Sequence, residues 1–138
     1  LAGGYIPVIA PIGYGADEVD YNINADTFAG DLARALGAQR LIYLTDVDGL
    51  LRDPDDVGTR IARMTPEQAL GAIGDYASGG MVPKVESAAR AVCQGVGSAH
   101  IINGTVTDTL DCAVCDDTGT GTTICAAGYA GGSGGRTI

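Results

Sequence analysis

The stretch NADTFAGDLARALGAQRLIYLTDVDGLL, residues 24–51, places a helix-forming segment directly before a strand-forming segment. Apolar side chains recur three and four residues apart through residues 25–36, a spacing that predicts a helix with one buried face. Asn24 is suited to cap this helix, and Asp26 lies in its first turn, where the helix dipole favours a negative charge. The short apolar run at 41–44 is typical of a buried strand. A helix that leads into a buried strand predicts an α/β fold.

The same alternation continues on both sides of this stretch. We expect further strands at residues 5–12, 99–102 and 122–124, and further helices at 65–76, 83–96 and 105–114. Residues 13–20 are polar and are expected to form a turn region. Alternating strands and helices predict an α/β sandwich built on a mostly parallel sheet.

Length, charge and hydropathy limit the class of protein. The 138 residues fit one domain, and 8 Lys+Arg against 17 Asp+Glu give a net charge of −9. This acidic balance argues against nucleic acid and anionic membranes as partners. No apolar run reaches the roughly 18–20 residues of a membrane-spanning helix, and no signal segment opens the chain. Leu1 leads almost directly into an apolar run, so we expect the natural N-terminus to lie upstream.

The C-terminal stretch and the cysteines have structural interpretations. Glycines crowd the end of the chain, so we expect residues 1–124 to form the domain and residues 125–138 to form a flexible tail. The four cysteines include one C-x-x-C pair, Cys112 and Cys115, but the further ligands of a structural zinc site are not at matching spacing. We expect reduced thiols that act as small hydrophobes, and no metal site in the protein.

Three polar segments, residues 22–26, 45–49 and 79–84, are expected at the edge of the sheet where ligands bind, beyond the carboxyl ends of the strands. Lys84 is the most informative residue among them. It falls in the first turn of a predicted helix, where a cation is disfavoured. A lysine there, after two glycines, fits a phosphate group that is shared between the ammonium and the helix N-terminus.

Each of these features also has a purely structural interpretation. Asn24 and Asp26 would only cap the helix and complement its dipole. Lys84 would be an exposed side chain whose stem lies over apolar surface. Asp46 and Asp48 suit a tight turn, and they lack the further oxygen ligands of a calcium loop. The residues alone leave both interpretations open.

A set of segments occurs in an order that is typical of one family. They are IPVIAPIG at 6–13, YNINADTFAGDLARALGA at 21–38, LIYLTDVDGLL at 41–51, SGGMVPKVESA at 78–88, AHIINGT at 99–105 and GTGTTI at 119–124. Together they resemble the C-terminal half of the acetylglutamate kinases, within the amino acid kinase family, over most of residues 1–124. The resemblance implies a three-layer α/β/α sandwich with a mainly parallel sheet. It also implies MgATP-dependent phosphorylation of the side-chain carboxylate of N-acetyl-L-glutamate, an early step of arginine biosynthesis.

The resemblance also implies roles for individual residues. Lys84 corresponds to the lysine that stabilises charge on the transferring phosphoryl group, and Asp26 to the aspartate that organises the catalytic lysines. Asn22 and Asn24 are expected to bind the acetylglutamate. The expected nucleotide-binding residues are Thr45, Asp46, Gly79, Gly80 and Met81.

The chain departs from the family pattern in two ways. The family's N-terminal half carries a glycine-rich phosphate loop, a second catalytic lysine and an arginine that grips the substrate, and none of these is in this chain. We therefore expect the chain alone to be inactive or nearly so. His100 matches a histidine of the arginine-inhibited members, which makes it a candidate residue for binding arginine as effector. Ala113 stands where those members carry a glutamate, so arginine feedback is only partly supported.

Other functions and partners stay open at this point. The alternatives are another kinase of the family, acting on carbamate, aspartate, glutamate or UMP, and a non-catalytic module that senses nucleotide. ATP and Mg²⁺ are the expected cofactors. Family members are often dimers or hexamers and some bind a PII signalling protein, so a second copy and PII are candidate partners. The expected location is the cytoplasm, or the plastid in a photosynthetic eukaryote.

Overall fold

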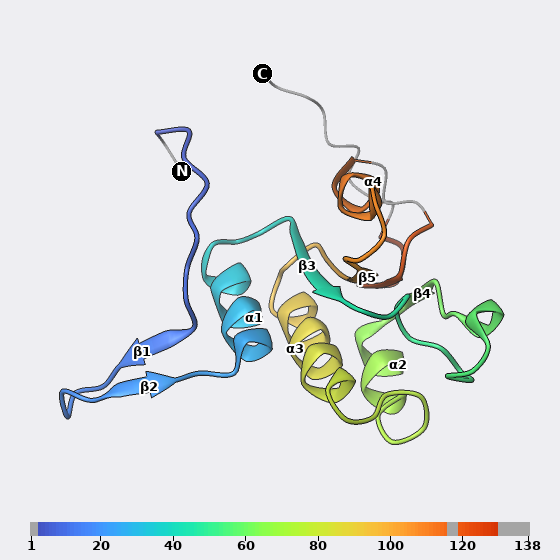
Figure 1. Ribbon diagram of the computed structural model, residues 1–138, viewed down its shortest axis with the longest axis horizontal. Coiled ribbons are helices and arrows are strands. Elements are labelled where there is room, and N and C mark those ends of the chain that lie inside the picture. Colours follow the sequence, from blue (N-terminus) through green and yellow to red (C-terminus); the bar gives the residue numbers. More distant parts are fainter. Residues whose placement is uncertain (1–2, 116–118, 130–138) are drawn as a thin grey trace.

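The structure is a computed structural model that describes residues 3–115 and 119–129 (Figure 1). Over these residues, the main sheet consists of β3 (Arg40–Thr45), β5 (Ser98–Asn103), β6 (Thr122–Cys125) and β4 (Arg63–Met64), side by side in that order. β3 pairs with β5 and β4 pairs with β6 in parallel, whereas β5 and β6 are antiparallel. A separate antiparallel pair, β1 (Ile12–Tyr14) and β2 (Asp20–Asn22), projects from the body of the molecule.

Helices cover both faces of this sheet. The helices are α1 (Ala25–Ala35), α2 (Pro66–Gly71), α3 (Met81–Cys93) and α4 (Thr109–Cys115), with a 3-10 turn at Val57–Thr59. α1, α3 and α2 lie on one face and α4 lies on the other (Figure 1). This arrangement confirms the expected three-layer α/β/α sandwich with parallel strand pairs.

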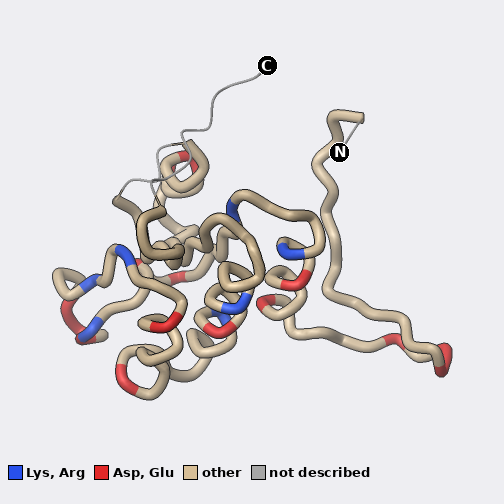
Figure 2. Tube along the Cα trace, turned by 180° about the vertical axis from the view of Figure 1, so that it is seen from behind, with Lys and Arg blue, Asp and Glu red and all other residues tan. Residues whose placement is uncertain are grey.

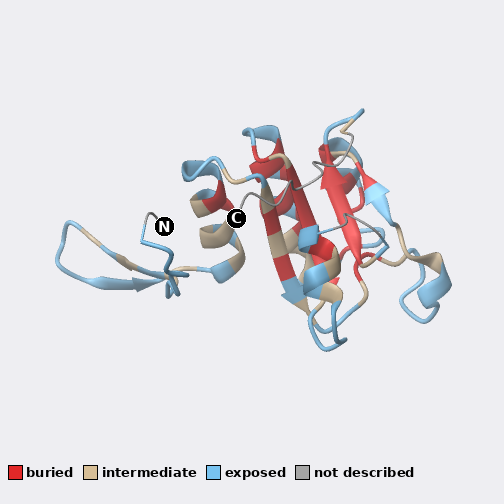
Figure 3. Cartoon of the chain, turned by 90° about the horizontal axis from the view of Figure 1, so that it is seen from above, coloured by how far each residue is buried: buried red, intermediate tan, exposed pale blue. Residues whose placement is uncertain are grey.

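The core lies between α3 and the sheet, and small side chains dominate it. α3 buries Val85, Ala88 and Ala89 completely, and β5 buries Ala99 and Ile101 completely. Alanines on this face let the helix backbone lie close to the strands, and burial of apolar surface is the main stabilising contribution. Figure 3 shows buried residues concentrated in these central elements, while the β1–β2 pair is exposed.

Two of the predicted helix starts are confirmed at atomic detail, whereas α3 begins at Met81, two residues before the predicted start. Asn24 Oδ1 accepts a hydrogen bond from the main-chain N–H of Thr27 at 3.0 Å, which makes it the N-cap of α1. Thr65 and Gln68 form a reciprocal capping box at the start of α2, where Pro66 occupies the first turn. Side chains therefore satisfy main-chain donors that would otherwise lack partners at the helix ends.

The strand expected at residues 5–12 is wrong for all but its last residue. β1 begins only at Ile12, and the apolar side chains before it are exposed, with Val8 at 97%. A strand needs a neighbour that pairs with its N–H and C=O groups, and within the described residues no strand lies beside this segment. Pro7 and Pro11 also lack the N–H group that a ladder requires.

Several element boundaries differ from the sequence prediction. α2 ends at Gly71 instead of near residue 76, and Gly74 then takes a left-handed φ of 92° as the chain turns. α4 begins at Thr109 instead of residue 105, because Asp108 has a φ of 68° that interrupts a right-handed helix. The two-residue strand β4 was not expected, since its pairing with β6 is a long-range contact.

The end of the chain is described only in part. Cys125, placed in the tail by the sequence prediction, is the last residue of β6 and is buried. Tyr129 follows it, and its main-chain carbonyl accepts a hydrogen bond from Arg63. The rest of the predicted tail, residues 130–138, lies outside the described residues. In the part of the chain that the structure describes, no helix has the length and apolar character needed to cross a membrane.

Replacing Thr65 with alanine is expected to lower the free energy of unfolding by about 1 kcal/mol, because the main-chain N–H of Gln68 loses its hydroxyl acceptor. Thr65→Ser keeps the hydroxyl and is the matched control, expected within about 0.5 kcal/mol of the wild type. Urea unfolding followed by circular dichroism measures both variants. Equal stability of all three proteins would contradict the role of the cap.

Candidate active site

The two charged residues singled out from the sequence meet in space. Lys84 lies in the first turn of α3 and Asp26 in the first turn of α1, and Lys84 Nζ is 3.0 Å from Asp26 Oδ2. The two side chains are only 21% and 17% exposed. Partial burial lowers the local dielectric, so this pair interacts more strongly than an exposed surface pair. The ion pair joins the beginnings of two neighbouring helices.

The ammonium of Lys84 is placed to bind an anion in addition to Asp26. It has three N–H donors, and the hydrogen bond to Asp26 uses one of them. The main-chain N–H groups of Met81 and Val82 donate to the carbonyls of Ser78 and Gly79, and Pro83 has no N–H group. At the start of α3 it is therefore the helix dipole, together with the ammonium, that favours an anion. Acidic and basic residues are interspersed along the chain (Figure 2). The protein as a whole is acidic, with a net charge of −9, so the positive charge of Lys84 can attract an anion only at close range. The arrangement suits a phosphate group.

Two buried hydroxyl groups lie close to the main-chain carbonyl oxygen of Asp26 and to each other. Ser87 Oγ, on α3, donates to this oxygen at 2.7 Å, and Tyr43 Oη, on β3, lies 3.1 Å from it. The two hydroxyl oxygens are 2.9 Å apart. α1, α3 and β3 are therefore joined at one main-chain atom of the residue that pairs with Lys84.

Gly30 allows this close approach between the two helices. It lies one turn after Asp26 in α1 and is buried. A Cβ atom at this position would lie 2.2 Å from Ser87 Oγ, far inside a van der Waals contact. Glycine in a helix interior is less stable than alanine by about 0.5–1 kcal/mol, and the contact with Ser87 explains its presence here.

The surroundings of the Tyr43 hydroxyl raise its pKa. Burial raises its pKa above the ordinary tyrosine value, the hydrogen bond with Ser87 opposes this in part, and the negative charges of Asp26 and Asp31 add to the increase. Tyr43 is therefore a neutral hydrogen-bonding group throughout the physiological pH range.

The residues expected to bind nucleotide lie at the same edge of the molecule. Thr45 is the last residue of β3, and its hydroxyl donates to Asp46 Oδ1 at 3.2 Å. Tyr43, two residues earlier, contacts the first turn of α1, so the carboxyl end of β3 lies beside the Lys84–Asp26 pair. Gly79, which has a φ of 53°, and Gly80 lead directly into α3 at Met81. The structure thus brings these segments together around the start of α3.

The two asparagines expected to bind substrate differ in their surroundings. Asn22 is exposed at the end of β2, where it is paired with Ile12. The Asn24 side-chain oxygen is used as the cap of α1, where it accepts from the main chain and the hydroxyl of Thr27. Only its NH₂ group is left to contact a ligand.

His100 is enclosed in the sheet and only 2% exposed. Its Nε2 lies 2.9 Å from Ser98 Oγ and its Nδ1 lies 3.2 Å from Thr123 Oγ1. Ala113, on α4, is also buried. Nε2 thus contacts a residue of the same strand, β5, whereas Nδ1 contacts the neighbouring strand β6. The role of His100 toward arginine stays a prediction.

A pocket lies beyond the ends of β3 and β5, apart from the Lys84–Asp26 pair. It has a volume of about 310 Å³, and its lining includes Asp48, Arg60 and Asn103. Asn103 Nδ2 donates to Asp48 Oδ1 at 2.9 Å, and Arg60 donates to the carbonyl of Gly121, so polar groups of the lining bind one another. None of the expected nucleotide-binding residues belongs to its described lining.

The sequence prediction missed Tyr43, Ser87 and Gly30 as parts of this site. A tyrosine in an otherwise aliphatic buried strand was one available signal, because a buried phenol needs a hydrogen-bond partner. A glycine inside a predicted helix was another. The partner of each is far away in the sequence, so only the fold identifies it.

The model of the amino acid kinase family matches residues 1–103, so the chain belongs to the amino acid kinase family.

Several proteins of known name are similar to this chain in sequence or in structure. The chain is 47% identical over 125 residues to an acetylglutamate kinase of Halothermothrix orenii and 50% identical over 125 residues to one of Methanosarcina mazei. Each match covers 90% of this chain but 43% of the relative, so the chain spans less than half the length of these proteins. Among solved structures, N-acetylglutamate synthase of Neisseria gonorrhoeae, complexed with coenzyme A and L-arginine, superposes with a TM-score of 0.75 at 27% identity. That match covers 85% of this chain and 27% of the synthase chain.

Gly30→Ala is expected to destabilise the protein by about 1–3 kcal/mol, because the added methyl group displaces Ser87 and separates α1 from α3. Gly71→Ala is the matched control, since Gly71 is also helical but has no atom within 4 Å of the position that an added Cβ would take. That variant is expected to be neutral or more stable by up to about 1 kcal/mol. Thermal and urea unfolding compare them, and a neutral Gly30→Ala would contradict the tight contact.

The free energy of unfolding is expected to fall as the pH rises above about 10, and to fall less in Tyr43→Phe. The raised pKa means that native Tyr43 keeps its proton while the unfolded chain loses it, so its contribution is complete below about pH 10 and is lost through the raised pKa. Urea unfolding at several pH values measures the difference. Parallel pH profiles for the two proteins would contradict the burial effect.

Proposed function

We propose that this chain supplies the nucleotide-binding half of an acetylglutamate kinase. The reaction is transfer of the γ-phosphoryl group of ATP to the side-chain carboxylate of N-acetyl-L-glutamate, a step of arginine biosynthesis. The observation that carries the proposal is the ion pair between Lys84 and Asp26 at the first turns of α3 and α1. The acetylglutamate kinase relatives, which are 47% and 50% identical to the chain, support this acceptor over the others used in the family.

The chemistry needs charge stabilisation more than covalent help from the protein. A carboxylate oxygen of the acceptor attacks the γ-phosphorus, the bond between that phosphorus and the bridging oxygen to the β-phosphate breaks, and ADP leaves. Negative charge spreads over the transferring group and the leaving oxygen. Lys84 stabilises this charge with its free N–H donors, and Asp26 holds the ammonium in place through the 3.0 Å contact.

The other site residues bind and orient the two substrates. Thr45, Asp46, Gly79, Gly80 and Met81 surround the nucleotide. Asn22 and the NH₂ group of Asn24 face the acetylglutamate. Their places at the start of α1 and α3 and at the end of β3 support this division.

Mg²⁺ fits the site as part of the nucleotide complex. The described residues contain no cluster of three or more His, Cys, Asp or Glu side chains that could hold a metal ion. Mg²⁺ in kinases is commonly bound by phosphate oxygens, waters and one or two carboxylates, which suits this donor set. When bound, it supplies charge neutralisation at the phosphates. The homo-oligomer, PII binding and the cellular location stay predictions.

Lys84→Met in the complete polypeptide to which this chain belongs is expected to lower kcat about 10²- to 10³-fold with the fold intact. The change removes the cation that stabilises the transferring group. Arg34→Met, which removes an exposed cation paired with Asp31 at 3.7 Å, is the matched control and is expected to keep wild-type turnover. A coupled assay of ADP release with N-acetyl-L-glutamate as acceptor measures all three proteins.

Full activity of Lys84→Met would refute the role of the lysine. A wild-type protein that phosphorylates carbamate, aspartate, glutamate or UMP but not N-acetyl-L-glutamate would refute the acceptor while leaving the kinase class intact. Binding of MgATP without turnover of any of these acceptors would favour the non-catalytic nucleotide-sensing module.

A further inference from the structure

Three oxygen atoms from three elements form a compact group beside the Lys84–Asp26 pair. They are Tyr43 Oη of β3, Ser87 Oγ of α3 and the main-chain carbonyl oxygen of Asp26 in α1, separated by 2.9, 2.7 and 3.1 Å. Each hydroxyl has one hydrogen, so two hydrogens serve three contacts. The two shorter distances define a directed chain, in which Tyr43 donates to Ser87 and Ser87 donates to the Asp26 carbonyl. Both buried hydroxyls then have an acceptor.

This hydrogen-bond chain attaches Asp26 to α3 at a second point. The Asp26 carboxylate binds Lys84, and the Asp26 carbonyl binds Ser87, which lies three residues further along α3. Residues three apart lie on one face of a helix. One contact fixes a distance, but two contacts from the same residue also fix its rotation. The first turn of α1, which is the part of a helix most prone to fray, is thereby held in one orientation.

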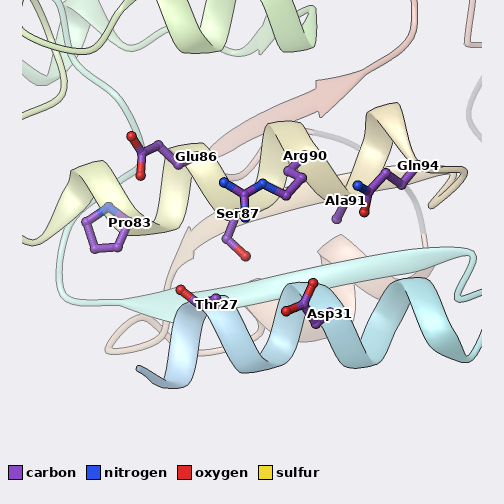
Figure 4. A pocket seen from close by; sticks show the side chains of 8 residues that line it. All are labelled: Thr27, Asp31, Pro83, Glu86, Ser87, Arg90, Ala91 and Gln94. Carbon is purple, nitrogen blue, oxygen red and sulfur yellow. The ribbon is translucent and has the colours of Figure 1, made fainter. Parts of the chain in front are cut away.

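The groove between the two helices is narrow where this attachment lies. Figure 4 shows Ser87 extending from α3 toward α1, in a groove of about 30 Å³ that Thr27 and Asp31 line from the other side. Gly30 permits the approach, because a Cβ atom there would overlap with Ser87 Oγ. Because the groove is closely packed, the Ser87 side chain has little room to rotate toward another hydrogen-bond acceptor.

We propose that Tyr43 and Ser87 are positioning residues for phosphoryl transfer, whose hydrogen-bond chain to the Asp26 carbonyl sets the place of the Asp26 carboxylate and, through it, of the Lys84 ammonium. The proposal rests on the proposed function, and neither hydroxyl is placed against substrate. Because phosphoryl transfer depends on the placement of charge, a loosened first turn of α1 lowers turnover while substrate binding is retained.

Kinetics of the complete polypeptide provide the first readout. Tyr43→Phe and Ser87→Ala are each expected to lower kcat about tenfold, with KM for ATP and for the acceptor changed by less than about twofold. The double variant is expected to be no slower than either single variant, since either change breaks the same chain. Tyr76→Phe, which removes a hydroxyl from a half-exposed tyrosine after α2, is the matched control and is expected to keep wild-type kcat.

The ammonium of Lys84 provides a second readout that does not depend on turnover. In the complete polypeptide labelled with ¹⁵N-lysine, the ammonium signal of Lys84 is assigned by NMR as the one that is missing from Lys84→Met. In the wild type this signal is expected to be sharpened by the contact with Asp26. It is expected to shift and broaden in Tyr43→Phe and Ser87→Ala, and to be unchanged in Tyr76→Phe. Circular dichroism tests whether each variant is folded. Should Ser87→Ala be unfolded, the result for Tyr43→Phe alone decides the test.

The two readouts together decide the proposal. Lower kcat at constant KM, non-additive losses and a changed ammonium signal support it. An unchanged kcat, an unchanged ammonium signal or additive losses in the double variant overturn it. If the wild-type complete polypeptide shows no acetylglutamate phosphorylation, the proposed function fails, and the ammonium signal alone decides whether Tyr43 and Ser87 position the ion pair.

Discussion

The ion pair between Lys84 and Asp26 is the contact on which the functional account depends. It places a cation in the first turn of α3, where the helix dipole disfavours it, and compensates that cost with a carboxylate from the first turn of α1. The positive ends of the two helix dipoles, at the same helix beginnings, also favour a negatively charged ligand. A phosphate group that enters this region meets both the ammonium and the helix ends.

The rest of the fold keeps these helix beginnings in place. Small buried side chains on α3 let it lie closely on β5, and Gly30 lets α1 lie closely on α3. Both helices run back along the sheet, so their first turns lie at the carboxyl end of β3, where Thr45 and Asp46 are found. In open α/β sheets ligands bind at this edge. The packing of α1 against α3 and of α3 against the sheet therefore determines the geometry of the site.

Local signals in the sequence predicted local structure well. The caps at Asn24 and Thr65 and the strand that ends at Thr45 follow from residues that are neighbours in the chain. The strand expected at residues 5–12 failed because pairing depends on a partner elsewhere, which apolar character alone cannot supply. In the site, position alone drew attention to Lys84, whereas its partnership with Asp26 followed from a family resemblance. The hydroxyl contacts to the Asp26 carbonyl join residues 17 and 61 positions apart, and only the fold brings them together.

A crystal structure of the complete polypeptide with a non-hydrolysable ATP analogue and N-acetyl-L-glutamate tests the central claim most directly. The account predicts the Lys84 ammonium nitrogen within about 3 Å of an oxygen of the terminal phosphate, still in contact with the Asp26 carboxylate. Terminal phosphates bound elsewhere, with the Lys84 ammonium turned to bulk solvent, would contradict it.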